Sequence, residues 1–290
     1  MRGIGASGVA MSAAAAPDAV RLRGGGSLPL LGLGTMHLRG SLCEEMVANA
    51  LRLGFRLVDT ASMYGNEREV GAALVASGVP RAELRVVSKL RPEDMGYDST
   101  LKACAASCAA LGVGYLDAYL VHAPGGSRRK RLETWRAMEA LLAEGTCRAI
   151  GVSNYHERHI REIEAEPTLS TLPHLNQCEF NPVCQQHELR AFCAERSIAW
   201  MAHTPFGGRG APLLRDGRLQ PACRHLSASP SQVHTPPHPS PLLIPAEGFE
   251  CCAGGAGLDA ASRRHRDPQD PERRPHAGEP QALHPRRRCR

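Results

Sequence analysis

Short apolar runs alternate with longer amphipathic stretches along residues 21–220 of this chain. The apolar runs are rich in Val, Leu and Ile, which favour strands, whereas the amphipathic stretches repeat apolar residues at the spacing of one helical face. Helices are predicted, for example, in CEEMVANALRL and RLETWRAMEALLAEG. Strands are predicted in seven runs, which read LGLGTM, FRLVDTA, LRVVSKL, YLDAYLVHA, CRAIGVSN, LNQCEFN and IAWMAHTPF. This alternation predicts an α/β fold with a parallel sheet, one strand short of a closed (β/α)8 barrel.

Polar side chains follow several of the predicted strands at the point where each strand ends. Asp59 ends one strand, and Tyr64 comes five residues later in the stretch VDTASMYGNEREVG. The other polar residues at strand ends are Lys89, His122, Ser153 and Asn154. Because the carboxyl ends of parallel strands meet at one face of a barrel, we expect these side chains to share one mouth. The spacing of Asp59 and Tyr64 suits a carboxylate that steers a phenol acting as a proton donor.

The composition of the chain changes near residue 220. Beyond this point the chain holds 12 of its 22 prolines and none of its lysines, and it ends in the arginine-rich run PRRRCR. Many prolines with few aliphatic residues favour disorder. Three segments are therefore predicted: a flexible N-terminal segment over residues 1–20, an incomplete barrel over residues 21–220, and a disordered Pro- and Arg-rich tail over residues 221–290.

The net charge and the cysteines limit the expected partners and setting. The formal net charge of +6 is modest, and the arginine-rich end has no interleaved aromatic residues, so we expect no nucleic-acid partner. The 11 cysteines form no CxxC pair, which favours a reduced, cytoplasmic setting and gives no metal site. No apolar run has transmembrane length, so no membrane partner is expected. The Ala- and Gly-rich first residues leave an organellar leader open, and we expect a monomer or a weak oligomer.

Residues 28–219 resemble the aldo-keto reductase family in a series of motifs that occur in the family's order. The motifs are LPLLGLGTM, GFRLVDTASMYGNEREVG, VVSKL, YLDAYLVHAP, AIGVSNY, LNQCEFNP and ELRAFCAERSIAWMAHTPFG. The resemblance implies a TIM (β/α)8 barrel of the aldo-keto reductase type, here truncated after the seventh strand. It also implies NAD(P)H-dependent reduction of an aldehyde or ketone to an alcohol, with NADPH as the cofactor and a small carbonyl compound as the substrate.

By this resemblance the catalytic residues are Tyr64, Asp59, Lys89 and His122. Tyr64 is expected to give a proton to the carbonyl oxygen, and Lys89, paired with Asp59, is expected to favour release of that proton. His122 is expected to orient the carbonyl and to stabilise negative charge developing on its oxygen. Each residue alone could have a purely structural role, but the four together in the family's order favour catalysis.

The resemblance also implies residues that bind the cofactor and the substrate. The expected cofactor-binding residues are Thr35, Met36, Asp59, Ser153, Asn154, Gln177, His203, Thr204, Phe206 and Gly207. The expected substrate-binding residues are Met36, Tyr64, His122 and Ala123. His203 stands where many members of the family have a tyrosine that stacks on the nicotinamide, and its ring can also stack. Met36 and Ala123 replace rings that relatives often place around the substrate, so the sequence predicts a roomier pocket and names no particular carbonyl compound.

The end of the family pattern is missing from this reading frame. Residues 227–232, SASPSQ, resemble the start of the family's next helix, but the eighth strand and the segment that grips the adenosine phosphate do not follow. Residues 254–269, read one base later with synonymous bases chosen freely, can encode VALAWTLHRGVTVIPK, which resembles the missing end. We therefore hypothesise that residues 233–253, together with one further base, come from a retained intron that shifts the frame.

Two functions remain open at this point. The first is an aldo-keto reductase that reduces aldehydes or ketones, which the complete set of four catalytic residues favours. The second is a catalytically impaired remnant of such an enzyme that acts as a binding or accessory protein. The missing end of the pattern favours this second function, because the residues that grip the adenosine phosphate are absent from the frame.

Overall fold

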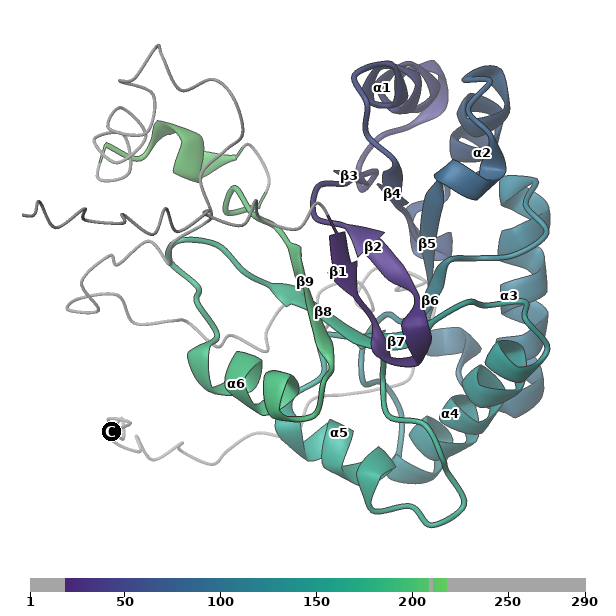
Figure 1. The fold of residues 1–290 in the computed structure, drawn as a ribbon, viewed down its shortest axis with the longest axis vertical. Helices are drawn as coiled ribbons and strands as arrows, with labels where there is room; N and C mark the ends of the chain where they lie inside the picture. Colours follow the sequence, from purple (N-terminus) through teal and green to yellow (C-terminus); the bar gives the residue numbers. More distant parts are fainter. Residues whose placement is uncertain (1–18, 209–210, 218–290) are drawn as a thin grey trace, which may run out of the picture. The chain divides into compact units, whose positions relative to one another are not determined.

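The computed structural model describes residues 19–208 and 211–217, and its centre is a sheet of seven parallel strands (Figure 1). The strands are β3 (Leu33–Gly34), β4 (Leu57–Asp59), β5 (Arg85–Leu90), β6 (Ala118–Val121), β7 (Ile150–Ser153), β8 (Leu175–Glu179) and β9 (Ala199–His203). Their order in the sheet follows their order in the sequence. Each strand lies within one of the seven predicted runs. The prediction of a nearly closed parallel barrel with seven strands is therefore confirmed for the described residues.

Six α-helices connect successive strands, as expected for repeated βα units. They are α1 (Gly40–Arg52), α2 (Glu67–Ala76), α3 (Tyr97–Leu111), α4 (Arg128–Ala143), α5 (Glu157–Glu164) and α6 (His187–Glu195). α1 shows why these stretches are helical, because its buried residues Cys43, Val47, Ala50 and Leu51 recur at intervals that place them on one face. Ser127 caps the N-terminus of α4, because its hydroxyl accepts a hydrogen bond from the backbone N–H of Lys130.

Five short 3-10 helices occur in the connections. They are η1 (Arg23–Gly25), η2 (Ser62–Tyr64), η3 (Arg81–Glu83), η4 (Pro92–Asp94) and η5 (Pro212–Arg215). η2 matters most for the site, because it places Tyr64 directly after β4. Gly65 closes this turn in the left-handed conformation, with φ of 63°, which glycine adopts without steric cost.

The strands separate two apolar clusters, because successive side chains of a strand point to opposite faces of the sheet. Val86 faces the helices, together with residues of α1, α2, α3 and α4, whereas Val87 faces the barrel interior. The interior cluster contains Leu57, Val87, Ala118, Leu120, Ala149 and Leu175. A polar residue two positions after an interior residue therefore also points into the barrel, which is how β5 directs Lys89 inward.

An antiparallel hairpin precedes the barrel and was not expected from the sequence. It consists of β1 (Ala19–Arg21) and β2 (Ser27–Pro29), joined through a turn in which Gly24 and Gly25 have positive φ. Leu22 and Leu28 of this hairpin are buried and belong to the interior cluster. The hairpin therefore packs against the inner apolar side of the barrel, and its first strand includes two residues that the sequence analysis had placed in the N-terminal segment.

β3 and β9 form the two ends of the sheet among the described residues. The four residues of β7 are fully buried, whereas in β9 Trp200 and Met201 are half-buried and Ala202 is exposed. The predicted disordered tail, 221–290, and the residues of the reading-frame hypothesis lie outside the described residues, as do residues 1–18. No helix in the described ranges is long and apolar enough to cross a membrane.

Candidate active site

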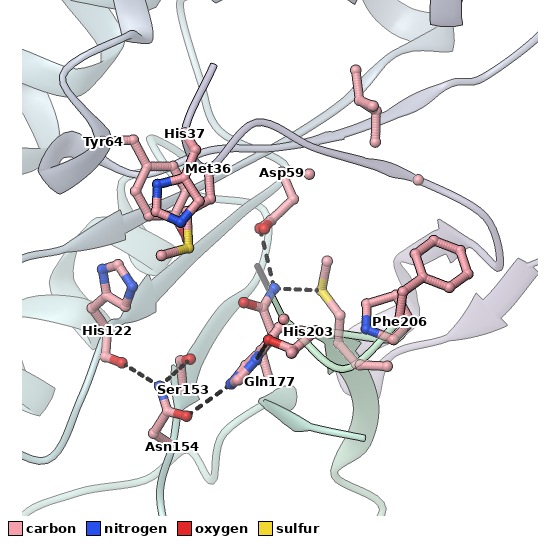
Figure 2. A pocket seen from close by; sticks show the side chains of 18 of the residues that line it. Met36, His37, Asp59, Tyr64, His122, Ser153, Asn154, Gln177, His203 and Phe206 are labelled. Atoms are coloured by element: carbon pink, nitrogen blue, oxygen red, sulfur yellow. Dashed lines mark hydrogen bonds between the residues drawn. The ribbon is translucent and has the colours of Figure 1, made fainter. Parts of the chain in front are cut away.

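A cavity of about 1010 Å³ opens at the carboxyl ends of the strands (Figure 2). Its wall includes Gly34 at the end of β3, Asp59 at the end of β4, Ser153 at the end of β7 and His203 at the end of β9. Its volume is at the upper end of the range of small-molecule and cofactor pockets, about 300–1,000 Å³. Among the polar residues expected at this mouth, Asp59, Tyr64, His122, Ser153 and Asn154 line the cavity, whereas Lys89 does not line it and contacts Asp59 and Tyr64.

Lys89 connects two of the predicted catalytic residues at one end of this cavity. Its Nζ lies 2.8 Å from both carboxylate oxygens of Asp59, 2.9 Å from the carbonyl oxygen of Thr60 and 3.4 Å from the hydroxyl of Tyr64. The Lys89 side chain is fully buried, and that of Asp59 is 14% exposed. The buried ammonium is therefore neutralised by Asp59 and held close to the phenol.

Backbone contacts fix Tyr64 next to Lys89. Ser62, in the same 3-10 turn as Tyr64, donates its hydroxyl to the carbonyl oxygen of Lys89 at 3.0 Å. The Lys89 Nζ also lies 5.1 Å from the centroid of the Tyr64 ring. This hydrogen bond joins η2, which follows β4, to β5. The position of the Tyr64 hydroxyl therefore depends on both β4 and β5.

Burial and charge act on the Tyr64 phenol in opposite directions. Burial raises the pKa of Tyr64 above its usual 10.0, and the Lys89 ammonium lowers it, with burial the larger effect. The sequence analysis expected Lys89 to favour release of the proton, and that contribution is present. The net effect is a phenol that keeps its proton at neutral pH.

His122 lies beside Tyr64 and is uncharged at neutral pH. The two rings meet edge to face, with centroids 5.6 Å apart (Figure 2). Burial, and to a smaller extent the nearby Lys89, lowers the pKa of His122 to about 4. Its Nδ1 is buried with no hydrogen-bond partner among the described residues. A neutral imidazole at this place can donate one N–H to an oxygen atom without adding a charge.

A second group of polar side chains lines the cavity across from Tyr64, on β7, β8 and β9 (Figure 2). Asn154 has a left-handed backbone, with φ of 60°, and donates through Nδ2 to the carbonyl oxygen of His122 at 3.0 Å. Its Oδ1 lies 2.9 Å from Nε2 of His203, and Nδ1 of His203 lies 2.8 Å from the hydroxyl of Thr204. These bonds hold the His203 ring in one orientation and connect the ends of β6, β7 and β9.

Gln177 joins this second group to the first. Its Nε2 donates to Asp59 Oδ1 at 3.1 Å, although the two residues are 118 positions apart in the chain. The same Nε2 lies 3.2 Å from the sulfur of Met201. Asp59 therefore receives hydrogen bonds from both Lys89 and Gln177, which leaves the carboxylate well satisfied inside the barrel.

Asn66 fastens the loop after β3 to the turn that contains Tyr64. This fully buried side chain donates through Nδ2 to the carbonyl oxygens of Thr35, at 2.8 Å, and Leu38, at 3.0 Å. Its Oδ1 accepts from the hydroxyl of Thr60 at 3.0 Å. Asn66 was not among the predicted site residues, because an asparagine after a glycine is typical of an ordinary turn.

Most of the predicted site residues line the cavity. They are Met36, Asp59, Tyr64, His122, Ser153, Asn154, Gln177, His203, Thr204 and Phe206. Thr35, Lys89, Ala123 and Gly207 do not line it, although Lys89 touches both Asp59 and Tyr64. Thr35 is fully buried and donates its hydroxyl to the carbonyl oxygen of Asp59 at 3.2 Å, so it supports the wall from behind.

Several residues of the wall were missed by the sequence analysis. They are Gly32, Leu33, Gly34, His37, Arg39, Met201, Ala202, Gly208 and Ala211. Among them, His37 and Arg39 have nitrogen-containing side chains that can form hydrogen bonds with a ligand. Both lie on the loop after β3, which is held by hydrogen bonds from Asn66. Within the described ranges, no group of three His, Cys, Asp or Glu residues is placed to hold a metal ion.

Comparison with known proteins places this chain in one family. A model of the Aldo/keto reductase family matches residues 30–231. An aldo-keto reductase of Mycolicibacterium vanbaalenii is 42% identical over 197 residues, which cover 68% of this chain and 70% of that protein. The glyoxal reductase of Bacillus subtilis is 41% identical over 189 residues, which cover 65% of this chain and 67% of that protein.

A solved structure gives the same result. The crystal structure of an aldo/keto reductase from Brucella melitensis superposes with a TM-score of 0.64 at 40% identity, covering 70% of this chain and 79% of that one. The fold and these relatives thus define an oxidoreductase built on a parallel α/β barrel. The chain belongs to the aldo/keto reductase family.

Proposed function

We propose that this protein reduces an aldehyde or a ketone to the corresponding alcohol with NADPH, and that Tyr64 donates the proton. The contact of Lys89 with both Asp59 and Tyr64, beside a neutral His122, carries this proposal. These groups lie at the wall of a cavity large enough for a cofactor and a small substrate. The Bacillus subtilis relative is a glyoxal reductase, which supports a carbonyl substrate for this chain as well.

The second polar group fits the nicotinamide end of the cofactor. A carboxamide offers an N–H donor and a carbonyl acceptor, so it needs side chains of both kinds. Gln177 uses its Nε2 within the protein, and its Oε1 makes no hydrogen bond to another described residue, so it can accept from the carboxamide. Ser153 and Asn154 on β7 and its end supply hydroxyl and amide groups on the same wall. When bound, NADPH supplies the hydride that the carbonyl carbon receives.

The protein's own groups manage the proton and the charge of this reaction. The carbonyl oxygen gains negative charge as its carbon is reduced, and it takes the proton from the Tyr64 hydroxyl. The resulting phenolate lies 3.4 Å from the Lys89 ammonium, which stabilises it in a buried setting. Burial keeps the phenol protonated beforehand, so the donor form is ready at neutral pH.

His122 is proposed to bind the carbonyl oxygen together with Tyr64. Its lowered pKa keeps the imidazole neutral, so it acts as a hydrogen-bond donor and not as a proton source. Its edge-to-face packing on Tyr64 brings the two donors to the same part of the cavity. The two residues can therefore hold one oxygen atom between them.

The setting and partners are part of the same proposal. The seven cysteines in the described part of the chain are free thiols, which agrees with a reducing cytoplasm. We propose a small carbonyl compound as the substrate, and a monomer or weak oligomer as the working form.

The alternative of an impaired, accessory protein is supported by two observations. The match to the family model ends at residue 231, and β3 and β9 are the ends of the described sheet. Within the described part of the chain no further strand pairs with the outer edge of β3 or of β9, and an unpaired strand edge leaves backbone hydrogen-bonding groups without partners. This alternative predicts a folded chain that binds ligands without turning over a carbonyl compound.

Consumption of NADPH by the purified chain with an aromatic aldehyde separates the two functions. We expect turnover in the wild type, and a loss of about 10²- to 10⁴-fold in the Tyr64→Phe variant, because general acid catalysis contributes about this much. Tyr97→Phe is a matched control, since Tyr97 is 44% exposed on α3 and lies outside the cavity wall. Equal activity in the Tyr64→Phe variant would refute the proton-donor role, and a folded but inactive wild type would favour the accessory protein.

A further inference from the structure

The charges on the cavity wall do not balance. Arg39 and Asp59 are the two residues with charged side chains among the described residues of the wall. Asp59 is already neutralised by Lys89, whose Nζ lies 2.8 Å from both of its oxygens. Arg39 therefore leaves this wall with one positive charge that the wall itself does not compensate.

Arg39 has no carboxylate partner among the described residues. Its Nη1 donates to the carbonyl oxygen of the preceding residue, Leu38, at 2.8 Å, and Arg39 is exposed at the mouth of the cavity. A guanidinium group has five N–H donors and keeps its charge at all relevant pH values. Most of its donors are thus available to a ligand, in a geometry that suits a carboxylate.

The loop that carries Arg39 is fixed on the Tyr64 side of the cavity. Asn66, two residues after Tyr64, donates to the carbonyl oxygen of Leu38 at 3.0 Å, so the backbone next to Arg39 is held to the proton-donor turn. The side chains that fit the nicotinamide belong to β7 and β8, which are the fifth and sixth strands of the sheet, whereas this loop follows β3, the first. Arg39 is therefore placed to meet the substrate end of the pocket.

We propose that the enzyme prefers carbonyl compounds that carry a carboxylate away from the carbonyl group, and that Arg39 determines this specificity. The inference rests on the proposed reductase function. The carbonyl oxygen reaches Tyr64 and His122 inside the cavity, while the carboxylate faces Arg39 at the mouth. The positive charge also attracts anionic substrates before they bind, because charged clefts raise the rate of encounter with opposite charges.

A matched pair of substrates tests this preference. The anionic probe is 4-formylbenzoate, and the neutral probe is its methyl ester, which has the same ring and aldehyde. The measured quantity is the ratio of kcat/KM for the acid to kcat/KM for the ester, in which a general effect of a variant on folding or turnover cancels. We expect Arg39→Gln to lower this ratio about fivefold, the size of a solvent-accessible ion pair, and Arg39→Lys to retain most of it.

Two controls make the result specific. Arg52→Gln removes the same charge from the other end of α1, outside the cavity wall, and should leave the ratio unchanged. The KM for NADPH is measured in each variant, because a guanidinium group could pair with the phosphates of the cofactor instead. An unchanged acid-to-ester ratio in Arg39→Gln overturns the inference, whether or not the KM for NADPH rises.

Binding without turnover distinguishes failure of this inference from failure of the proposed function. If neither aldehyde is reduced, the reductase proposal fails for this chain, and the role of Arg39 is decided by NMR titration of the full chain with 4-formylbenzoate. Binding that is about fivefold weaker in Arg39→Gln than in the wild type supports the anion site. Equal binding in the two proteins, or none in the wild type, overturns it.

Discussion

The Nζ of Lys89 lies 2.8 Å from both carboxylate oxygens of Asp59, and the lysine side chain has no exposed surface. Neither charge would be stable alone at this depth, because burial of an unpaired charge is costly. The pair therefore serves the fold as well as the chemistry. It holds β4 to β5 at the carboxyl face and keeps a cation next to the Tyr64 hydroxyl.

Removing one member of this pair should destabilise the barrel strongly. We expect Lys89→Met to lower the free energy of unfolding by about 3–5 kcal/mol, because it leaves the Asp59 carboxylate buried without its partner. The double variant with Asp59→Asn should recover part of this loss, since it removes the stranded charge. Lys102→Met, on the exposed side of α3, is the control and should change stability by less than about 0.5 kcal/mol. Urea unfolding measures the free energy of unfolding of the wild type and of each variant. A Lys89→Met protein as stable as the wild type would contradict a stabilising role of the ion pair.

The Asn66 side chain should control both stability and the position of the loop after β3. Asn66→Ala removes three buried or partly buried hydrogen bonds and leaves their partners unsatisfied, so we expect a loss of about 2–3 kcal/mol in unfolding free energy. It should also raise the KM for 4-formylbenzoate, because the backbone next to Arg39 is released. Asn49→Ala on α1 is the matched control. A change in stability with no change in KM would show that the loop does not need this clamp.

The pH dependence of reduction should be flat across the neutral range. His122, with a pKa of about 4, stays neutral above pH 5, and Tyr64, with its pKa raised above 10, stays protonated below pH 9. We therefore expect kcat/KM for the neutral methyl ester to be constant between about pH 5.5 and 9. A His122→Gln variant should lower the rate without changing the shape of the profile. An inflection near pH 6.5 that disappears in His122→Gln would show that this histidine titrates at its ordinary pKa.

The messenger RNA should exist in a second, spliced form. The family match ends at residue 231, next to the junction after Gln232 that the reading-frame hypothesis predicts. Sequencing of cDNA across codons 232–254 should find a product that lacks codons 233–253 together with the first base of codon 254, and that therefore continues in the shifted frame. That product should have a higher melting temperature than the 290-residue chain, because it encodes a further strand for the edges of the sheet. The continuous frame as the single product in cDNA would contradict the hypothesis.

The seven barrel strands could be predicted because each is a short apolar run that ends in polar or turn residues. β5 is a clear case, since Val86 and Val87 are followed by Lys89 at the mouth. The β1–β2 hairpin could not be predicted in the same way. Its turn contains three successive glycines, Gly24, Gly25 and Gly26, and its strands have three residues each, so its stability comes from Leu22 and Leu28 packing inside the barrel.

Site residues that lie on a strand or at its end could be predicted from the sequence. Site residues that a loop brings to the cavity could not. Asp59, Ser153 and Gln177 reach the cavity because strand direction and the alternation of faces determine it. The places of His37 and Arg39 depend on hydrogen bonds from Asn66, which joins segments about 30 residues apart. The hydrogen bond between His203 and Asn154 also connects residues that are distant in the chain, and no local sequence pattern predicts it.

Transfer of deuterium tests the central claim most directly. The 290-residue chain is incubated with the methyl ester of 4-formylbenzoate and with NADPH that carries deuterium at both hydrogen positions of the nicotinamide C4, and the product is analysed by mass spectrometry and NMR. We predict an alcohol with one deuterium on the former aldehyde carbon, formed about 10²- to 10⁴-fold more slowly by the Tyr64→Phe variant. A folded wild-type chain that forms no labelled alcohol would contradict the proposal that it is a carbonyl reductase.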